Sequence, residues 1–340
     1  MGGVRMKPKL KDYLSAGIAA LKVKFNIKVP LRVTYIVTNS CNLRCKYCYA
    51  DSFSKKSDMN TCQVKNMMKE FKDLGTKIWK FGGGEPLIRN DIEDLIEYGR
   101  KLGFIISIDT NGTLTSKKIH ILKKVDNVQI SIDGPKKIHD AIRGEGVFNK
   151  CIESINILNK IGIKPMINCV ISDKNIDYIE EMVLLAKKHN AYINFQTVVP
   201  VTNRSKEMIS KKLIEKDVFN KIIALKKKYD FIAVSDASLK RFRDYYSGKI
   251  KKFQKKCLAG KIYCIVSPSG EVSRCISELG TKKISGLEKG FGKAFKNLSK
   301  DYGCDCTFCN YYDLSNLYSL NLKRIIRAYN NLRKGRWIYN

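Results

Sequence analysis

The sequence contains no run of 18 apolar residues, so no segment of it predicts a membrane-spanning helix. Histidine is scarce: the chain has His120, His139 and His189, and their spacing is not typical of metal ligands. Acidic residues are half as numerous as basic ones, 32 against 64, which gives a net charge of +32. The charge alone would suit nucleic acid, but no RNA-binding motif accompanies it, so we expect no such partner.

The sequence also shows no convincing signal peptide. Twelve cysteines in such a chain indicate a reducing, cytoplasmic environment, not a disulfide framework. At 340 residues, the chain is long enough for one large α/β core and a small appended domain.

Three of the cysteines, Cys41, Cys45 and Cys48, lie in one short stretch with the spacing C-x3-C-x2-C. Three thiolates can hold three irons of a cubic 4Fe–4S cluster and leave the fourth iron open for a small molecule. A zinc site is the alternative, but structural zinc usually takes four ligands. No other cysteine or histidine lies within ten residues of this loop.

Apolar, β-branched stretches predict six strands, with helical patterns between them such as those at 61–74, 147–161 and 176–189. Repeated βα units imply a parallel sheet. We therefore predict an α/β fold, a partial (β/α)6 TIM-type barrel that is open on one side. The cysteine loop and a glycine-rich loop at 82–86 each follow a strand, where such folds place their chemistry. The predicted strands are 31–38, 77–81, 104–109, 127–132, 164–171 and 191–198.

Together, these loops resemble the radical S-adenosylmethionine (radical SAM) family. The likeness includes the aromatic residue before the last cysteine, Tyr47, and a GGEP motif one βα unit further on. In the family, the GGEP loop holds the methionine amino group of SAM. A serine and an aspartate lie by the SAM ribose, and an arginine approaches its carboxylate. Taken singly, these later residues also fit a strand-end hydroxyl, turn residues and a solvated charge. The SAM-binding residues implied are Tyr47, Gly83, Gly84, Glu85, Pro86, Asn111, Ser131, Asp133 and Arg143.

The resemblance also implies an activity. One electron, from a donor such as flavodoxin or ferredoxin, would cleave SAM bound at the open iron. The 5′-deoxyadenosyl radical formed would then take a hydrogen from the substrate. We expect oxidation or modification of a peptide or small biosynthetic substrate, with a lipid or glycan at a membrane as the alternative. A non-catalytic iron–sulfur electron carrier and a zinc-binding RNA or interaction module remain as alternatives of another class.

The C-terminal third has a second set of cysteines, which lies on both sides of an expected β-hairpin turn at PSGEV. This region resembles the SPASM module in its shortened form, called twitch, which carries one auxiliary 4Fe–4S cluster. A zinc ribbon is the alternative. Cys264 is a weaker candidate ligand, and Cys304 is a substitute for Cys306. The predicted ligands are Cys257, Cys275, Cys306 and Cys309.

Four segments follow from these patterns: a basic amphipathic segment at 1–29, the barrel at 30–235, the auxiliary-cluster domain at 250–312 and a basic amphipathic helix at 313–340. The two ends combine an apolar stripe with lysine and arginine. Such stripes either pack on the barrel or contact an anionic membrane surface, which would make the enzyme a peripheral membrane protein.

Overall fold

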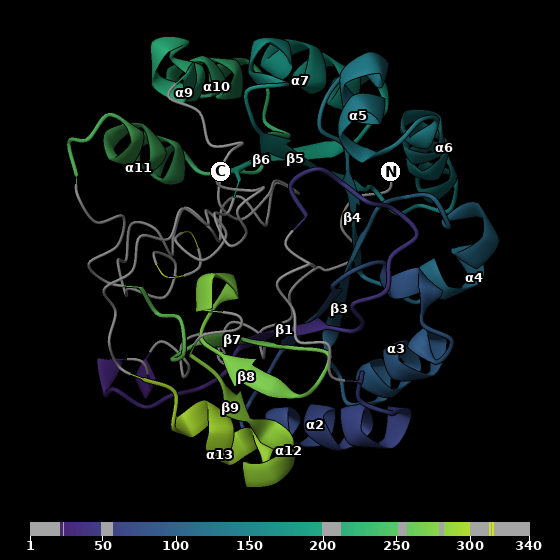
Figure 1. The fold of residues 1–340 in the computed structure, drawn as a ribbon, viewed down its shortest axis with the longest axis vertical. Coiled ribbons are helices and arrows are strands. Elements are labelled where there is room, and N and C mark those ends of the chain that lie inside the picture. The colour runs from purple at the N-terminus through teal and green to yellow at the C-terminus, as the bar shows by residue number, and fades with distance from the viewer. Residues whose placement is uncertain are drawn as a thin grey trace.

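A computed structural model describes residues 21–22, 24–48, 57–198, 212–250, 257–278, 282–299, 313 and 315. Its described part is built on one sheet with the spatial order β6-β5-β4-β3-β2-β1-β7-β8-β9 (Figure 1). Neighbouring strands from β1 to β6 pair in parallel. These six strands are β1 (Arg32–Ile36), β2 (Ile78–Gly82), β3 (Ile105–Thr110), β4 (Asn127–Ser131), β5 (Met166–Ile171) and β6 (Tyr192–Thr197).

Helices follow the strands in turn and lie around the outside of the sheet (Figure 1). Their bounds are α2 (Thr61–Asp73), α3 (Ile92–Lys101), α4 (Ile119–Leu122), α5 (Lys136–Arg143), α6 (Val147–Lys160), α7 (Ile179–Lys188), α9 (Lys212–Glu215), α10 (Val218–Lys228), α11 (Asp236–Tyr246), α12 (Gly286–Lys289) and α13 (Phe291–Lys296).

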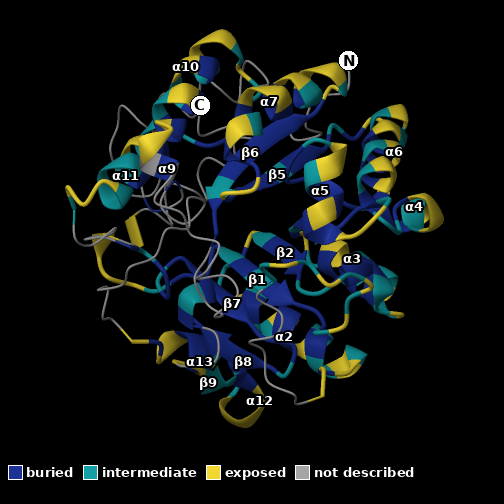
Figure 2. Cartoon of the chain, turned by 45° about the horizontal axis from the view of Figure 1, so that its top comes forward, coloured by how far each residue is buried: buried dark blue, intermediate teal, exposed yellow. Residues whose placement is uncertain are grey.

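The predicted partial barrel is confirmed, and each of the six predicted strands ends within two residues of its observed bounds. Residues that alternate along the strands explain this agreement. One face of the sheet is apolar and packs against the helices, where Trp79 stacks on Phe104 at 5.3 Å between ring centroids and contacts Phe71 edge-on. The strands are mostly buried, and the helices expose one side to solvent (Figure 2).

The expected hairpin at PSGEV is also confirmed. Its strands belong to the same sheet as the barrel strands. Strand β7 (Tyr263–Val266) pairs in parallel with β1, and the antiparallel strands β8 (Glu271–Ser273) and β9 (Ile284–Ser285) follow. The described part of 250–312 therefore extends the barrel sheet. Its register pairs Tyr35 of β1 with Val266, so backbone hydrogen bonds join the two regions.

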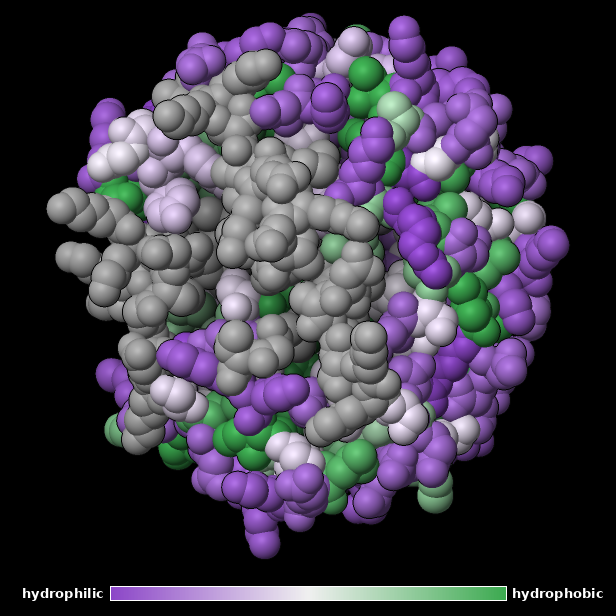
Figure 3. Space-filling view, in the orientation of Figure 1, coloured by the Kyte–Doolittle hydropathy of each residue, from purple (hydrophilic) through white to green (hydrophobic). Residues whose placement is uncertain are grey.

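Most of the two predicted amphipathic ends lies outside the described residues. Leu21 and Phe25, from the apolar stripe of the N-terminal segment, are 52% and 72% exposed. Asp313 and Ser315 are buried, and the Asp313 carboxylate accepts a hydrogen bond of 2.5 Å from Ser238 Oγ of α11. Among the described helices, none has the length and apolarity needed to cross a membrane. Hydrophilic side chains predominate at the rim of the face in Figure 3.

Candidate active site

The cysteine loop follows β1 at the carboxyl end of the sheet. Cys41, Cys45 and Cys48 are partly exposed. The backbone N–H of Cys48 donates to the carbonyl of Cys45 at 3.2 Å, and the N–H of Leu43 donates to the Cys41 sulfur at 3.4 Å. The loop therefore forms a turn in which a backbone N–H group donates to one of the cysteine sulfurs.

The glycine-rich loop after β2 packs directly on the chain that leads into the cysteine loop. The N–H groups of Gly84 and Glu85 each donate at 3.0 Å, to the carbonyls of Thr38 and Ser40. A Cβ atom on Gly84 would lie 2.1 Å from the Ser40 oxygen, so only glycine permits this approach. Gly83 has a φ of +129°, a conformation that side chains rarely adopt. These glycines thus serve the contact between two loops.

Glu85 is fully buried, and its carboxylate already has three donors within the protein. One oxygen accepts from Thr110 Oγ1 at 2.9 Å and from Leu87 N at 3.1 Å, and the other accepts from Asn111 N at 2.8 Å. Burial raises the pKa of Glu85 to about 7, although these hydrogen bonds oppose the shift. Glu85 therefore ties the loop after β2 to the end of β3. Its contact with the SAM amino group stays a prediction, as do those of Gly83, Gly84 and Pro86.

Asn111, which is predicted to bind SAM, lies beside the cysteine loop. Its Nδ2 donates to Asn42 Oδ1 at 2.9 Å and lies 3.8 Å from the Cys41 sulfur, and its Oδ1 accepts from Thr113. Asn111 is thus a bridge between the end of β3 and the first cysteine, in addition to being a turn residue.

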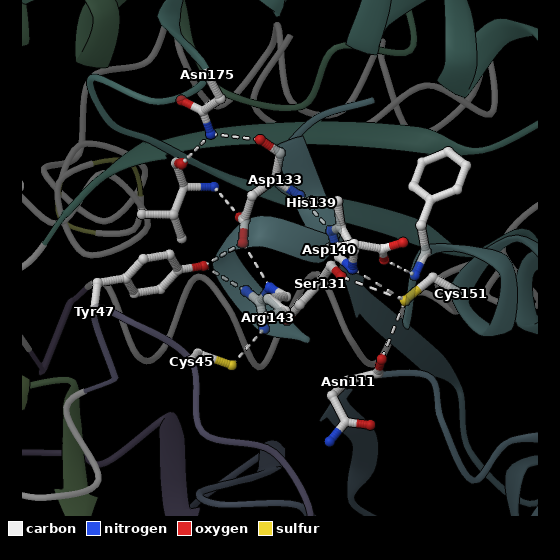
Figure 4. A network of polar contacts seen from close by, with 12 residues as sticks. Cys45, Tyr47, Asn111, Ser131, Asp133, His139, Asp140, Arg143, Cys151 and Asn175 are labelled. Atoms are coloured by element: carbon white, nitrogen blue, oxygen red, sulfur yellow. Dashed lines mark hydrogen bonds and ion pairs between the residues drawn. The ribbon is translucent and has the colours of Figure 1, made fainter. Parts of the chain in front are cut away.

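Asp133, Arg143 and Tyr47 form one buried network (Figure 4). Arg143 Nε donates to Asp133 Oδ2 at 2.5 Å, and Arg143 Nη2 donates at 2.5 Å to the hydroxyl of Tyr47. That hydroxyl donates in turn to Asp133 Oδ2 at 2.5 Å, while Asp133 Oδ1 accepts from Val170 N at 3.0 Å. The Ser131 side chain is half-buried at the end of β4. The ribose and carboxylate contacts of Ser131, Asp133 and Arg143 stay predictions.

The charges in this network stabilise one another. Burial alone would raise the pKa of Asp133, but Arg143 outweighs it and holds that pKa below its usual value. Burial raises the pKa of the Cys45 thiol to about 11, against the opposing effect of Arg143. Burial also places the pKa of Tyr47 well above its usual value.

Three residues of the network were not predicted from the sequence as site residues. Asn175 Nδ2 donates to the carbonyls of Asp133 at 2.6 Å and Val170 at 2.7 Å, and its Oδ1 accepts from Ser172 N. His139 Nδ1 accepts from Asp133 N at 3.1 Å, and the Cys151 thiol donates to the Asn111 carbonyl at 3.2 Å. Only Asn175 carried a usable signal, because asparagine shortly after a strand commonly forms such a turn.

The other face of the sheet is concave and polar. Lys80 Nζ lies 2.7 Å from Asp109 Oδ2 and donates to Gln129 Oε1 at 3.2 Å. Further along, Asn194 Nδ2 donates to Asn168 Oδ1 at 3.0 Å. Within the described residues, Asp109 Oδ1 is buried and has no hydrogen-bond partner. Leaving a buried acceptor unsatisfied is costly, so this oxygen favours a hydrogen-bond donor beside it.

Two of the predicted auxiliary ligands come together. Cys257 and Cys275 are buried in one small apolar cluster with Tyr263, whose hydroxyl is 3.1 Å from the Cys257 sulfur. Cys264 points away from them into the main core, so this conformation does not suit it as a ligand. The remaining predicted positions, Cys304, Cys306 and Cys309, lie outside the described residues.

The donor set of the cysteine loop fits a cubic iron–sulfur cluster. In the described part of the chain, no three Cys, His, Asp or Glu side chains converge as ligands of a single metal ion would. A cubic cluster needs no such convergence, because each thiolate binds a different iron. Donors already face two of the sulfurs, from Leu43 N and Asn111 to Cys41 and from Arg143 Nη1 to Cys45 at 3.7 Å.

Comparison with known proteins agrees with this geometry. Residues 35–186 match the family model described as the Radical SAM superfamily. An AdoMet-dependent heme synthase of Oleidesulfovibrio alaskensis is 27% identical over 269 residues, which cover 72% of this chain and 69% of that protein. The mycofactocin maturase MftC of Mycolicibacterium smegmatis is 24% identical over 332 residues, covering 92% of this chain and 81% of that protein.

Among solved structures, Streptococcus suis SuiB bound to S-adenosylmethionine has the same fold, with a TM-score of 0.66 and 20% identity over 82% of this chain and 68% of SuiB. The family match begins in β1, ends in α7 and includes the cysteine loop, the glycine-rich loop and the Asp133–Arg143 pair. The chain therefore belongs to the radical SAM superfamily and is an enzyme of that family.

Proposed function

We propose that this enzyme modifies or oxidises a peptide substrate that binds along the concave face of the sheet. The polarity of that face is the observation that carries the proposal. Closed TIM barrels fill this space with bulky branched side chains. Here, strands β2 to β6 contribute Lys80, Asp109, Gln129, Asn168 and Asn194 instead.

Such a surface favours a substrate rich in hydrogen-bonding groups. Asp109 Oδ1 lacks a donor among the described residues, and an amide, hydroxyl or ammonium group would supply one. A lipid chain would leave Asp109 Oδ1 without a donor, at a cost of ~1–3 kcal/mol. The concave face thus favours a peptide over the lipid alternative.

The names of relatives support the same class. MftC is a maturase, and SuiB has been crystallised with its precursor peptide SuiA. Membership in the family implies S-adenosylmethionine and one 4Fe–4S cluster as cofactors. We propose Cys41, Cys45 and Cys48 as the ligands of that cluster, and a second cluster held by Cys257 and Cys275 with the two later cysteines.

When bound, the cluster and S-adenosylmethionine would supply the radical chemistry that removes a hydrogen atom from the substrate. The chain's own task is positional. Glu85, Asn111 and Arg143 hold the three loops together at one end of the sheet. The polar face then orients the substrate so that one C–H bond lies near the radical.

The test uses anaerobically reconstituted enzyme with a chemical reductant and S-adenosylmethionine. We expect release of 5′-deoxyadenosine, and none from the variant with Cys41, Cys45 and Cys48 all replaced by alanine. Peptides encoded by short reading frames beside the gene are then added, and their mass is measured. A change of mass that needs both S-adenosylmethionine and the three cysteines supports the proposal. If only non-peptide substrates react, the peptide assignment is wrong.

Asp109→Asn provides a sharper test of the concave face. This variant keeps the size of the side chain but weakens its ion pair with Lys80 and reduces its capacity as an acceptor. Peptide modification should fall by at least tenfold, while 5′-deoxyadenosine release without peptide stays near that of the parent enzyme. Equal loss of both activities would place Asp109 in S-adenosylmethionine binding instead.

A second candidate rests on the heme synthases, whose identity of 27% exceeds the 24% of MftC, over a shorter stretch. In that case, the reconstituted enzyme would change the visible absorption of an added iron porphyrin and leave every peptide intact. One set of incubations, with peptides and with an iron porphyrin, therefore distinguishes the two candidates.

A further inference from the structure

The end of helix α5 contacts the cysteine loop at three places. Lys46 N donates to the Ile142 carbonyl at 3.1 Å. Arg143 Nη2 donates to the Tyr47 hydroxyl at 2.5 Å, and Arg143 Nη1 lies 3.7 Å from the Cys45 sulfur, within hydrogen-bond range for sulfur. Three consecutive residues of the loop are thus held by two consecutive residues of one helix, as the close view in Figure 4 shows for Arg143.

Arg143 itself has little freedom. It is 9% exposed, its Nε is bonded to Asp133 at 2.5 Å, and its guanidinium carbon lies 5.5 Å from the centre of the Tyr47 ring. Asp133 is in turn held by Val170 N and Asn175. The guanidinium is therefore fixed from the barrel side, and one of its N–H groups is left to face the cysteine sulfur.

We propose that Arg143 is a positioning residue that holds Cys45 in place and raises the reduction potential of the cluster that the three cysteines would bind. A reduced cluster carries one more negative charge than an oxidised one. Hydrogen bonds and positive charge at a ligand sulfur stabilise that added charge, and they are established determinants of cluster potentials. The Asp133 carboxylate, which is bonded to Arg143 Nε, cancels part of this effect, whereas Arg143 Nη1 lies 3.7 Å from the Cys45 sulfur.

This role differs from a contact with the SAM carboxylate. It requires neither S-adenosylmethionine nor any substrate, so it is measured without them and does not depend on the peptide proposal. With a higher reduction potential, the cluster would accept the first electron from its donor more readily. Because each terminal guanidinium nitrogen carries two N–H groups, Nη1 and Nη2 each keep a second N–H group, and the two roles are compatible.

The experiment measures the midpoint potential of the reconstituted cluster by redox titration followed by electron paramagnetic resonance, without S-adenosylmethionine. Arg143→Gln should lower the equilibrium ratio of reduced to oxidised cluster at least tenfold at a given potential, which corresponds to about 59 mV for one electron. Arg44→Gln is the matched control. Arg44 lies in the same loop and carries the same charge, but it is exposed, and within the described part of the chain it donates to the carbonyls of Cys41 and Leu43.

A potential in Arg143→Gln equal to that of the parent protein, with full iron content, overturns the proposal. An equal drop in Arg44→Gln also overturns it, because the effect would then be one of net charge. If Arg143→Gln does not retain the cluster, Arg143→Lys is measured. Its single ammonium cannot reach Asp133, Tyr47 and Cys45 together, so its potential should lie below that of the parent protein. A potential at or above the parent value contradicts the proposal.

Discussion

Replacing Gly84 by alanine should separate the two loops that build the site. The new Cβ would lie 2.1 Å from the Ser40 oxygen and 2.7 Å from its carbonyl carbon. Contacts under 3.0 Å essentially do not occur for real Cβ atoms, so the chain at Ser40 must move by about 0.9 Å. Both partners are backbone, and no side chain can rotate away to relieve the contact.

The magnitude follows from the bonds that this movement breaks. Two backbone hydrogen bonds of 3.0 Å join the loops, from Gly84 N to Thr38 O and from Glu85 N to Ser40 O. Ser40 is exposed and Gly84 is half-buried, so each bond contributes the ordinary net ~0.5–1.5 kcal/mol, and loss of both costs roughly 1–3 kcal/mol. This compares with a typical total stability of about 5–15 kcal/mol. Ser40 immediately precedes Cys41, so the same movement displaces the first cysteine.

The assay combines iron content after reconstitution with urea unfolding of the iron-free protein. Gly82→Ala is the control, because its Cβ would meet only side chains, at 3.8 Å and 3.9 Å, in ordinary contact. We expect Gly84→Ala to unfold at clearly lower urea and to retain less than half of the iron, and Gly82→Ala to resemble the parent. Parent-like iron and stability in Gly84→Ala, or equal damage in both variants, would refute the reasoning.

Three further predictions concern the auxiliary site, the buried glutamate and the charged ends. The parent protein should hold about eight irons, and replacing Cys257 and Cys275 by alanine should leave about four, the content of one cubic cluster; zinc in their place would support a zinc ribbon. Because burial raises the folded-state pKa of Glu85 to about 7 from its ordinary value of 4.5, its contribution to stability is fully present below pH 4.5 and is lost as the pH rises through 7. Unfolding by urea at pH 5 and pH 7.5 should show this fall, and Glu85→Gln should lack it and be less stable at both; a parallel fall in the variant would assign the effect to another group. Finally, the protein should co-sediment with anionic vesicles at low salt and less with neutral ones, since each basic side chain near such a surface contributes about 1 kcal/mol. Deleting residues 1–25 should weaken this binding and leave the iron content unchanged; loss of iron would mean that the segment packs on the barrel.

Sequence reasoning succeeded where the signal is local. Strand bounds followed from runs of β-branched and apolar residues. The start of helix α2 lies at a capping box that Asn60 and Gln63 form. The cysteine spacing lies within eight residues, so no knowledge of the fold was needed to interpret it. The loops after β1 and β2 could be assigned to one end of the sheet from the direction of parallel strands alone.

Sequence patterns predicted less about residues whose partners lie far away in the sequence. Glu85 is predicted to bind an ammonium group, and two of its three donors come from residues 110 and 111, which meet it only after β2 and β3 align. Arg143 is predicted to approach the SAM carboxylate, but the sequence does not reveal its burial against Asp133 and Tyr47, the latter 96 residues earlier. The C-terminal hairpin reads as a separate domain, yet it continues the sheet beside β1.

The sequence by itself determined the parallel α/β barrel, the position of the cysteine and glycine loops and the family, because alternation, spacing and short motifs are properties of neighbouring residues. Only the tertiary structure decided which polar side chains bond to one another and which are left to bind a ligand. Burial removes water as a partner, so each buried charge must find another group, and the geometry of the fold selects that group. The pairing of Arg143 with Asp133 is one result of that selection, and another is Asp109 Oδ1, which has no donor among the described residues.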